Sequence, residues 1–239
     1  VAALKGYKCI FTLPDKVAQD KIDTLKAYGA EVVITPTEVP PESPESYYSV
    51  AHRITQETSG AFQPNQYVNL NNPKAHYETT GPEIWEQTEG KVTVFVAGMG
   101  TGGTISGVGE YLKEQKPAVK IVGVDHEGSI YYSTNIHQYL VEGIGEDFYP
   151  ETMNLNIIDK IIQVTDQPCF DMTRRLAKEE GILVGGSCGA AVVGALRYAK
   201  ENNSGPEDVF VILLPDSGRG YLKKVFSDTW LKEHGLQVN

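Results

Sequence analysis

The hydrophobic pattern near the start of the chain alternates between short apolar runs and an amphipathic stretch. Residues 7–13 form an apolar run with β-branched side chains, residues 15–28 are amphipathic, and residues 31–35 are apolar again after Gly29. This order predicts a strand, a helix and a second strand. The pattern recurs in residues 92–97, 104–114 and 119–124, and again in residues 182–185, 187–200 and 209–214. Such alternation predicts an α/β fold with helices on both faces of a mainly parallel sheet.

Two connecting segments and the start of the chain add to this picture. Residues 36–44 are rich in proline, and residues 125–147 are rich in Gly, Tyr and Ser without a helical period. Loops longer than about 12 to 15 residues are more often lids or binding segments than spacers, so we expect the second segment to be functional. Residues 1–5, followed by Gly6, read as the last turn of a helix. We therefore expect the chain to lack an N-terminal part.

Composition narrows the class of protein. The 21 Lys and Arg residues against 31 Asp and Glu residues give a formal net charge of −10, which disfavours nucleic-acid and membrane partners. The 3 cysteines contain no CxxC pair and the 5 histidines show no metal-binding spacing, so we expect no metal. No apolar run approaches the roughly 20 residues of a membrane span. These features are typical of a cytoplasmic protein.

A glycine cluster lies where the strand predicted at 92–97 gives way to a helix. Its sequence is Gly98-Met-Gly100-Thr-Gly102-Gly-Thr104. Glycines let backbone N–H groups approach an anion closely, the helix N-terminus adds a positive dipole end, and the two threonine hydroxyls can donate further hydrogen bonds. The cluster therefore predicts a phosphate site.

The same glycines allow a second interpretation. Gly98, Gly100 and Gly103 satisfy the dinucleotide fingerprint G-x-G-x-x-G, and Asp125 follows at about the spacing of a ribose-binding carboxylate. An NAD-dependent dehydrogenase is therefore a distant alternative. Against it, the cluster is internal, whereas the fingerprint normally opens its domain.

Two further turns have the same small, hydroxyl-rich character. They are Gly185-Gly-Ser187-Cys-Gly189 and Pro215-Asp-Ser217-Gly-Arg219. Because ligands of open parallel sheets bind at the carboxyl ends of the strands, we expect the three turns to converge on one crevice. A polar aromatic cofactor with a phosphate tail would use all of them, although each turn alone could be a helix cap.

These motifs, taken in order, resemble a known family. They are Gly100-Thr-Gly-Gly-Thr104, Val124-Asp-His-Glu-Gly-Ser129, Val141-Glu-Gly-Ile-Gly145, Gly185-Gly-Ser187 and Pro215-Asp-Ser217-x-Arg219-x-Tyr221. The chain resembles the fold-type II pyridoxal-phosphate enzymes of the cysteine synthase and cystathionine β-synthase family, and within it the cystathionine β-synthases. His126 and Glu146 stand where eukaryotic members carry Pro and Tyr, which is similar to bacterial members. These departures leave the second substrate open.

The resemblance implies a tryptophan synthase β-like fold with three α/β/α layers, pyridoxal 5′-phosphate as cofactor, and amino-acid substrates. It implies condensation of L-serine with L-homocysteine to L-cystathionine and water, with cysteine synthase as the alternative, in a cytoplasmic homodimer. The implied cofactor residues are Gly100, Thr101, Gly102, Gly103 and Thr104 at the phosphate and Ser187 at the pyridine nitrogen. The implied substrate residues are Gln66, Tyr67, Gly143 and Gly145; for Gln66 and Tyr67, packing at a strand end is an equally good explanation.

The catalytic lysine of that family is not found in the sequence. It belongs to a Ser-x-Lys-Asp-Arg stretch upstream of a Thr-Ser-Gly-Asn-Thr-Gly loop, and neither motif occurs here. We therefore assign no catalytic residue. We expect residues 1–239 to be a catalytic core that is incomplete at its N-terminus, with part of the small domain, most of the large domain and no regulatory domain. We expect this chain to be inactive alone.

Overall fold

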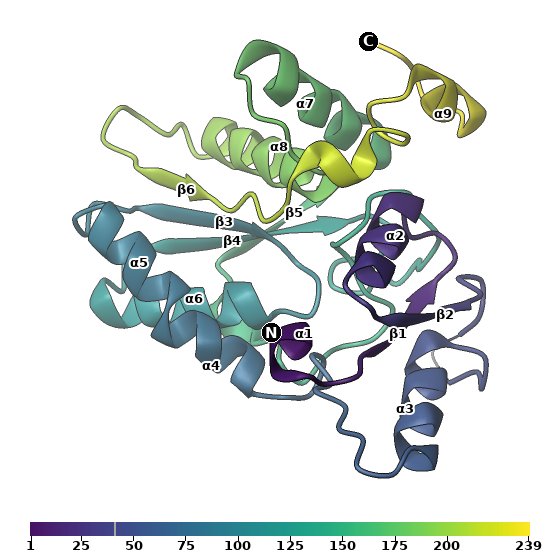
Figure 1. The fold of residues 1–239 in the computed structure, drawn as a ribbon. Helices are drawn as coiled ribbons and strands as arrows, with labels where there is room; N and C mark the ends of the chain where they lie inside the picture. Colours follow the sequence, from purple (N-terminus) through teal and green to yellow (C-terminus); the bar gives the residue numbers. More distant parts are fainter. Residues whose placement is uncertain (41) are drawn as a thin grey trace. The chain divides into compact units, whose positions relative to one another are not determined.

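The structure, a computed structural model, describes residues 1–40 and 42–239 (Figure 1). It divides into two compact units, Val1–Pro64 and Asn65–Asn239. All strand pairs within its sheets are parallel, which confirms the α/β class. The boundary between the units was not predicted, because no change of composition marks it.

The N-terminal unit contains a two-stranded sheet. Ile10 lies opposite Glu31 and Pro14 opposite Thr35, so the two apolar runs pair along their full length. Pro41, in the proline-rich loop predicted at 36–44, lies outside the described residues. The elements are α1 (Ala2–Lys5), β1 (Ile10–Pro14), α2 (Gln19–Ala27), β2 (Glu31–Thr35) and α3 (Tyr47–Glu57).

The C-terminal unit contains a four-stranded sheet in the order β5-β4-β3-β6. Val94 lies opposite both Lys120 and Phe210, and Val122 lies opposite Lys160. The strands are β3 (Val94–Gly98), β4 (Lys120–His126), β5 (Lys160–Val164) and β6 (Phe210–Ile212). The helices are α4 (Asn71–Glu78), α5 (Thr80–Gln87), α6 (Gly103–Gln115), α7 (Asp166–Glu179), α8 (Gly186–Glu201) and α9 (Asp228–Glu233), with short 3-10 turns at Leu155–Ile157 and Gly218–Tyr221.

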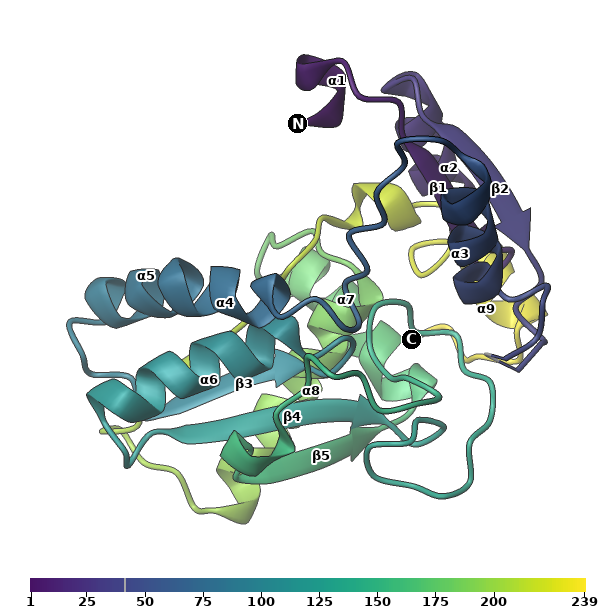
Figure 2. The same ribbon diagram turned by 90° about the horizontal axis from the view of Figure 1, so that it is seen from below.

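Helices cover both faces of this sheet. Figures 1 and 2 show α4, α5 and α6 on one face and α7 and α8 on the other. The side chains of β3 alternate accordingly, since Val94 and Val96 join one buried cluster while Phe95 and Ala97 join the other. A strand buried on both faces reads as a continuous apolar run, which is why residues 92–97 were recognisable in the sequence.

Some predictions of individual elements were wrong or incomplete. Residues 182–185 were predicted as a strand, but they form a single bridge, from Val184 to Ser217. Ile182 and Leu183 remain 42% and 40% exposed, so no neighbouring strand covers this apolar run. The strand β5 and the helices α3, α4, α5, α7 and α9 were not predicted. The buried residues of α7, which are Cys169, Phe170, Thr173 and Leu176, follow a helical spacing that the sequence analysis did not use.

No helix in the described part of the chain combines the length and the apolar character that a bilayer crossing needs.

Candidate functional site

A cavity of about 170 Å³ lies at the carboxyl end of β3 in the C-terminal unit. It is lined by residues from the turn after β3, from the loop before Glu146, from the start of α8 and from the segment after β6. The structure thus brings together the turns that the sequence marked as glycine-rich. The predicted cofactor residues that line it are Gly100, Thr101, Gly102, Gly103, Thr104 and Ser187.

The first glycine loop, residues 100–104, leads into the N-terminus of α6. Gly102 is the N-cap residue and has φ 85°, a left-handed conformation that favours glycine. Among the described residues no side-chain cap hydrogen bond is made at this helix start, so the N–H groups of its first turn lack a capping acceptor. Uncapped N–H groups at the positive end of a helix, beside two threonine hydroxyls, suit a phosphate group.

Neutral polar groups hold this first glycine loop from behind. The side-chain amide of Asn72 donates to Thr101 Oγ1 at 3.1 Å. The hydroxyl of Thr152 lies 2.6 Å from the carbonyl oxygen of Thr101, and the hydroxyl of Tyr131 donates to the carbonyl of Gly100 at 2.6 Å. The loop is therefore fixed through uncharged donors.

Close packing of α4 against α6 brings Asn72 and His76 to the loop. A Cβ on Gly103 would lie 1.9 Å from Asn72 Oδ1, so a side chain at this position would displace the Asn72 amide from Thr101. The ring nitrogen His76 Nε2 lies 3.1 Å from Thr104 Oγ1. The predicted glycine at 103 thus has a second role, which is to leave room for the Asn72 side chain that contacts Thr101.

The second glycine loop, residues 140–146, forms another wall of the cavity. Gly143 and Ile144 line it, and the N–H of Gly145 donates to the carbonyl of Met99 at 2.6 Å. Glu142 pairs with Lys224 at 2.6 Å, and both side chains are mostly buried. This loop is therefore tied down by charged groups as well as by the backbone.

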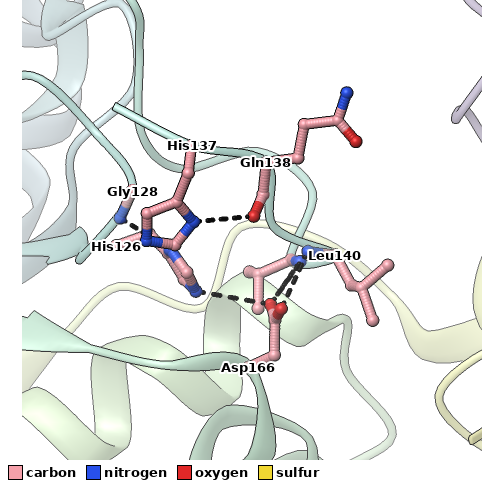
Figure 3. Close-up of polar contacts among 7 residues, drawn as sticks. His126, Gly128, His137, Gln138, Leu140 and Asp166 are labelled. Carbon is pink, nitrogen blue, oxygen red and sulfur yellow. Dashed lines mark hydrogen bonds and ion pairs between the residues drawn. The ribbon is translucent and has the colours of Figure 1, made fainter. Parts of the chain in front are cut away.

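Asp166, the first residue of α7, anchors the start of the second glycine loop (Figure 3). Its carboxylate accepts the N–H groups of Leu140 at 3.0 Å and Val141 at 2.9 Å. Burial of the carboxyl raises its pKa, but the hydrogen bonds from His126 and from these two N–H groups outweigh it, so the pKa of Asp166 lies below its usual value. The carboxylate is held in its charged form.

His126 faces the same carboxylate from the end of β4. The ring is 2% exposed, and its Nδ1 accepts the N–H of Gly128 at 3.1 Å. A neutral ring that accepts at Nδ1 carries its proton on Nε2, and this nitrogen lies 3.5 Å from Asp166 Oδ1 (Figure 3). The ring also stacks on Tyr139, with 4.3 Å between the centroids. His126 Nε2 therefore faces the Asp166 carboxylate at a distance longer than that of its two backbone hydrogen bonds.

Ser187 lies in the first turn of α8, which also has no side-chain cap. It is 6% exposed. Asp216, in the segment after β6, packs closely against this turn, since a Cβ on Gly185 would lie 2.3 Å from Asp216 Oδ1. The Tyr221 hydroxyl donates to the other oxygen of Asp216 at 2.6 Å, which fixes the carboxylate. A second helix N-terminus thus meets the cavity beside a neutral hydroxyl.

The remaining predicted substrate residues lie apart from the lining. Gln66 and Tyr67 belong to a turn rather than a strand end, and their carbonyl oxygens lie 3.3 Å and 3.2 Å from the Thr152 hydroxyl. Gly145 packs closely against Tyr139, since a Cβ on Gly145 would lie 2.3 Å from the Tyr139 hydroxyl. These three residues shape the walls without lining the cavity.

Asp125 cannot serve as the ribose-binding carboxylate of a dehydrogenase. It is 0% exposed, and both of its oxygens lack a hydrogen-bond partner among the described residues. Burial raises the pKa of Asp125 to about 6, despite smaller opposing effects of the nearby Ser129 hydroxyl and backbone. The dinucleotide interpretation of the glycine loop therefore loses its acidic partner.

Several supporting residues were missed by the sequence analysis. Asn72 and His76 are one helical turn apart on α4, a spacing that could have marked a polar face. Thr152, Tyr131 and Asp166 carry no such signal, because their partners lie 25 or more residues away along the chain.

Comparison with known proteins supplies the class to which this fold and cavity belong. Residues 1–216 match the family described as pyridoxal-phosphate dependent enzyme, so the chain belongs to that family. Its cofactor is pyridoxal 5′-phosphate, and the uncapped N-terminus of α6 fits the phosphate of that group. The dehydrogenase alternative is wrong.

Particular relatives refine this assignment. A cystathionine beta-synthase of Apis mellifera is 46% identical over 98% of this chain and 47% of its own length. The crystal structure of an O-acetylserine dependent cystathionine beta-synthase from Helicobacter pylori matches with a TM-score of 0.86 and 37% identity, over 94% of this chain and 72% of that one. A hydrogen sulfide-producing enzyme from Fusobacterium nucleatum matches with a TM-score of 0.87 and 36% identity, over 92% and 74%. The chain spans about half the length of the curated relatives it matches.

Proposed function

We propose that this chain supplies the phosphate site and part of the substrate site of an enzyme that condenses L-serine with L-homocysteine. The products are L-cystathionine and water: the bond from serine Cβ to its hydroxyl oxygen breaks, and a bond from Cβ to the homocysteine sulfur forms. The observation that carries the proposal is the uncapped α6 N-terminus, which faces one cavity with Thr101, Thr104 and Ser187. Similarity to cystathionine beta-synthases over 98% of the chain supports the substrate pair.

Each wall of the cavity then has a distinct role. The first glycine loop binds the cofactor phosphate through backbone N–H groups and threonine hydroxyls. The neutral hydroxyl of Ser187 would form a hydrogen bond with the pyridine nitrogen of the cofactor, and it would not keep that nitrogen protonated as a carboxylate would. When bound, the cofactor supplies an electron sink for the negative charge that develops at the serine α-carbon. Gly143 and Ile144 form another part of the cavity lining.

We also propose that the 239-residue chain does not complete this reaction alone. The cavity lining in the described part of the chain contains no lysine. Removal of the α-proton of serine needs a base beside that carbon, and a lysine that also binds the cofactor serves this purpose in the family that the motifs resemble. Binding of the phosphate group, in contrast, needs no residue beyond those already present.

O-acetylserine is the second candidate for the first substrate. The relative from Helicobacter pylori is described as dependent on O-acetylserine, and it matches this chain with a TM-score of 0.86. Acetate is a better leaving group than hydroxide, so the same cavity walls could support either reaction. The identity of the leaving group therefore has to be measured.

We also propose that the protein is cytoplasmic and forms a homodimer. The cysteines at 9, 169 and 188 are free, which suits a reducing compartment such as the cytoplasm. The resemblance to the cystathionine β-synthase family supports a homodimer, which light scattering of the purified protein would test.

The test uses the complete product of the native gene and the 239-residue chain side by side. Each is supplied with pyridoxal 5′-phosphate and homocysteine, together with either L-serine or O-acetylserine, and cystathionine is measured by mass spectrometry. We expect cystathionine from L-serine with the complete product, and none with the chain. Formation from O-acetylserine alone would replace the first candidate by the second, and turnover by the chain would contradict its proposed inactivity.

A further inference from the structure

The imidazole of His76 lies between two hydroxyl groups. Its Nε2 is 3.1 Å from Thr104 Oγ1, in the first turn of α6, and its Nδ1 is 3.0 Å from Thr80 Oγ1, at the start of α5. The ring is half-buried, and burial lowers the pKa of His76 below its usual value, so the ring is neutral at pH 7. Thr104 in turn lines the cavity.

A neutral imidazole has one N–H donor and one acceptor nitrogen. The hydrogen bonds among Thr80, His76 and Thr104 can therefore run in either of two directions. In the first, the Thr80 hydroxyl donates a hydrogen bond to Nδ1, and the Nε2–H group donates one to Thr104 Oγ1. In the second, the proton is on Nδ1: the ring donates to Thr80 Oγ1, and the Thr104 hydroxyl donates a hydrogen bond to Nε2. The second arrangement leaves Thr104 with lone pairs alone to offer an anion, and these repel phosphate oxygens.

We propose that His76 is a positioning residue for the phosphate site, and that as its Nε2–H tautomer it donates to Thr104 and frees the Thr104 hydroxyl proton to reach the phosphate. This inference rests on the proposed function, because it takes a phosphate group in the cavity as given. It adds that the affinity of the site for phosphate depends on a histidine that does not itself line the cavity.

Affinity measurements on the 239-residue chain test the proposal. The probes are pyridoxal 5′-phosphate and inorganic phosphate, titrated by calorimetry. We expect His76→Leu to lower the affinity for each probe by roughly five- to tenfold, which corresponds to the loss of about one hydrogen bond. His76→Gln keeps an N–H donor at a similar reach and should recover most of the affinity.

A double-mutant cycle separates positioning from simple packing. Thr104→Val removes the hydroxyl that His76 is proposed to orient, so His76→Leu should have no further effect on affinity in that background. The control is His52→Leu, because His52 is exposed in the N-terminal unit and contacts Gln56 in the same i to i+4 relation. It should leave both affinities unchanged. Additive losses from His76→Leu and Thr104→Val would overturn the proposal.

The tautomer can be observed without any substitution. In ¹⁵N-labelled wild-type chain saturated with inorganic phosphate, we expect Nε2 of His76 to show the shift of a protonated nitrogen and Nδ1 that of an unprotonated one. A proton on Nδ1 would contradict the inference even if phosphate binds. Failure of the wild-type chain to bind either probe would overturn the phosphate site itself, and with it both proposals, so the two failures are distinguishable.

Discussion

The two glycine loops of the cavity are held in place by opposite kinds of chemistry. Behind the first, residues 100–104, are the amide of Asn72, the hydroxyls of Thr152 and Tyr131, and a neutral imidazole. Behind the second, residues 140–146, are the carboxylate of Asp166 and the Lys224–Glu142 ion pair. Loops that look alike in the sequence thus depend on different supports.

The difference follows from what each loop faces. A carboxylate placed directly behind the first loop would repel a bound phosphate, since charges a few ångströms apart interact strongly away from bulk water. The hydrogen bonds to the first loop come from neutral donors, and the Glu146 carboxylate near Gly100 is not among them. The second loop supplies backbone and an apolar side chain to the cavity, so its anchors can be charged. We therefore expect the first support to be insensitive to pH near neutrality and the second to depend on ionisation.

The largest effect is expected from Asp166→Ala. This change leaves the N–H groups of Leu140 and Val141 without their acceptor and removes the charge that faces His126. Loss of a largely buried carboxylate with several donors should lower the free energy of unfolding by about 3 kcal/mol. Urea denaturation gives this value, and hydrogen exchange should show faster exchange at residues 140 and 141.

A control and a pH series accompany that variant. Glu179→Gln alters an exposed carboxylate on the same helix and should leave stability unchanged. Because the folded pKa of Asp166 is depressed, its contribution is present above the unfolded pKa of about 3.9 and is lost as the pH falls through the folded value. The wild type and the variant should therefore converge in acid. A constant difference down to pH 2 would show that Asp166 acts through packing.

A somewhat smaller effect, of opposite sign, is expected from Asp125→Asn. The pKa of Asp125 is raised to about 6, so the folded state favours the protonated form and loses stability as the pH rises through that value. At pH 8 the variant should be more stable than the wild type by about 2 kcal/mol, and at pH 4 the two should be similar. Urea denaturation at both values tests this.

Asp159→Asn is the matched comparison for Asp125. Asp159 accepts the N–H of Ile121 and pairs with Lys113 at 2.8 Å, and these interactions hold its pKa below the usual value although burial opposes them. The same substitution should therefore destabilise the protein at pH 8. If both variants shift stability in the same direction, the burial of Asp125 without a partner does not control its ionisation.

The sequence predicted the loops better than their supports. The proposed anion site was inferred from glycines between an apolar strand and a helix, because strand, turn and helix start are local features. Asp166 could not be assigned to the second loop, since its partners lie 25 and 26 residues away and its helix was not recognised. The tautomer of His126 likewise depends on the backbone N–H of Gly128, which only the folded turn brings to the ring.

The smallest effect is expected from Thr152→Val, which probes the neutral support alone. The side chain is 2% exposed and its hydroxyl lies 2.6 Å from the carbonyl oxygen of Thr101. Valine has nearly the same shape, so the change should cost about 1 kcal/mol in the free energy of unfolding, the value of one neutral hydrogen bond. Thr24→Val is the control, because its exposed hydroxyl bonds to Asp20 within a helix and water can replace it.

The pH dependence of this last variant decides between the two kinds of support. No group that titrates near neutrality takes part in the Thr152–Thr101 hydrogen bond, so the loss should be the same at pH 6 and pH 9 and in low or high salt. A loss that grows with salt or changes with pH would mean that charged groups also carry the first glycine loop. In that case the contrast between the loops would be one of degree, and the phosphate site would tolerate nearby charge better than its neutral surroundings indicate.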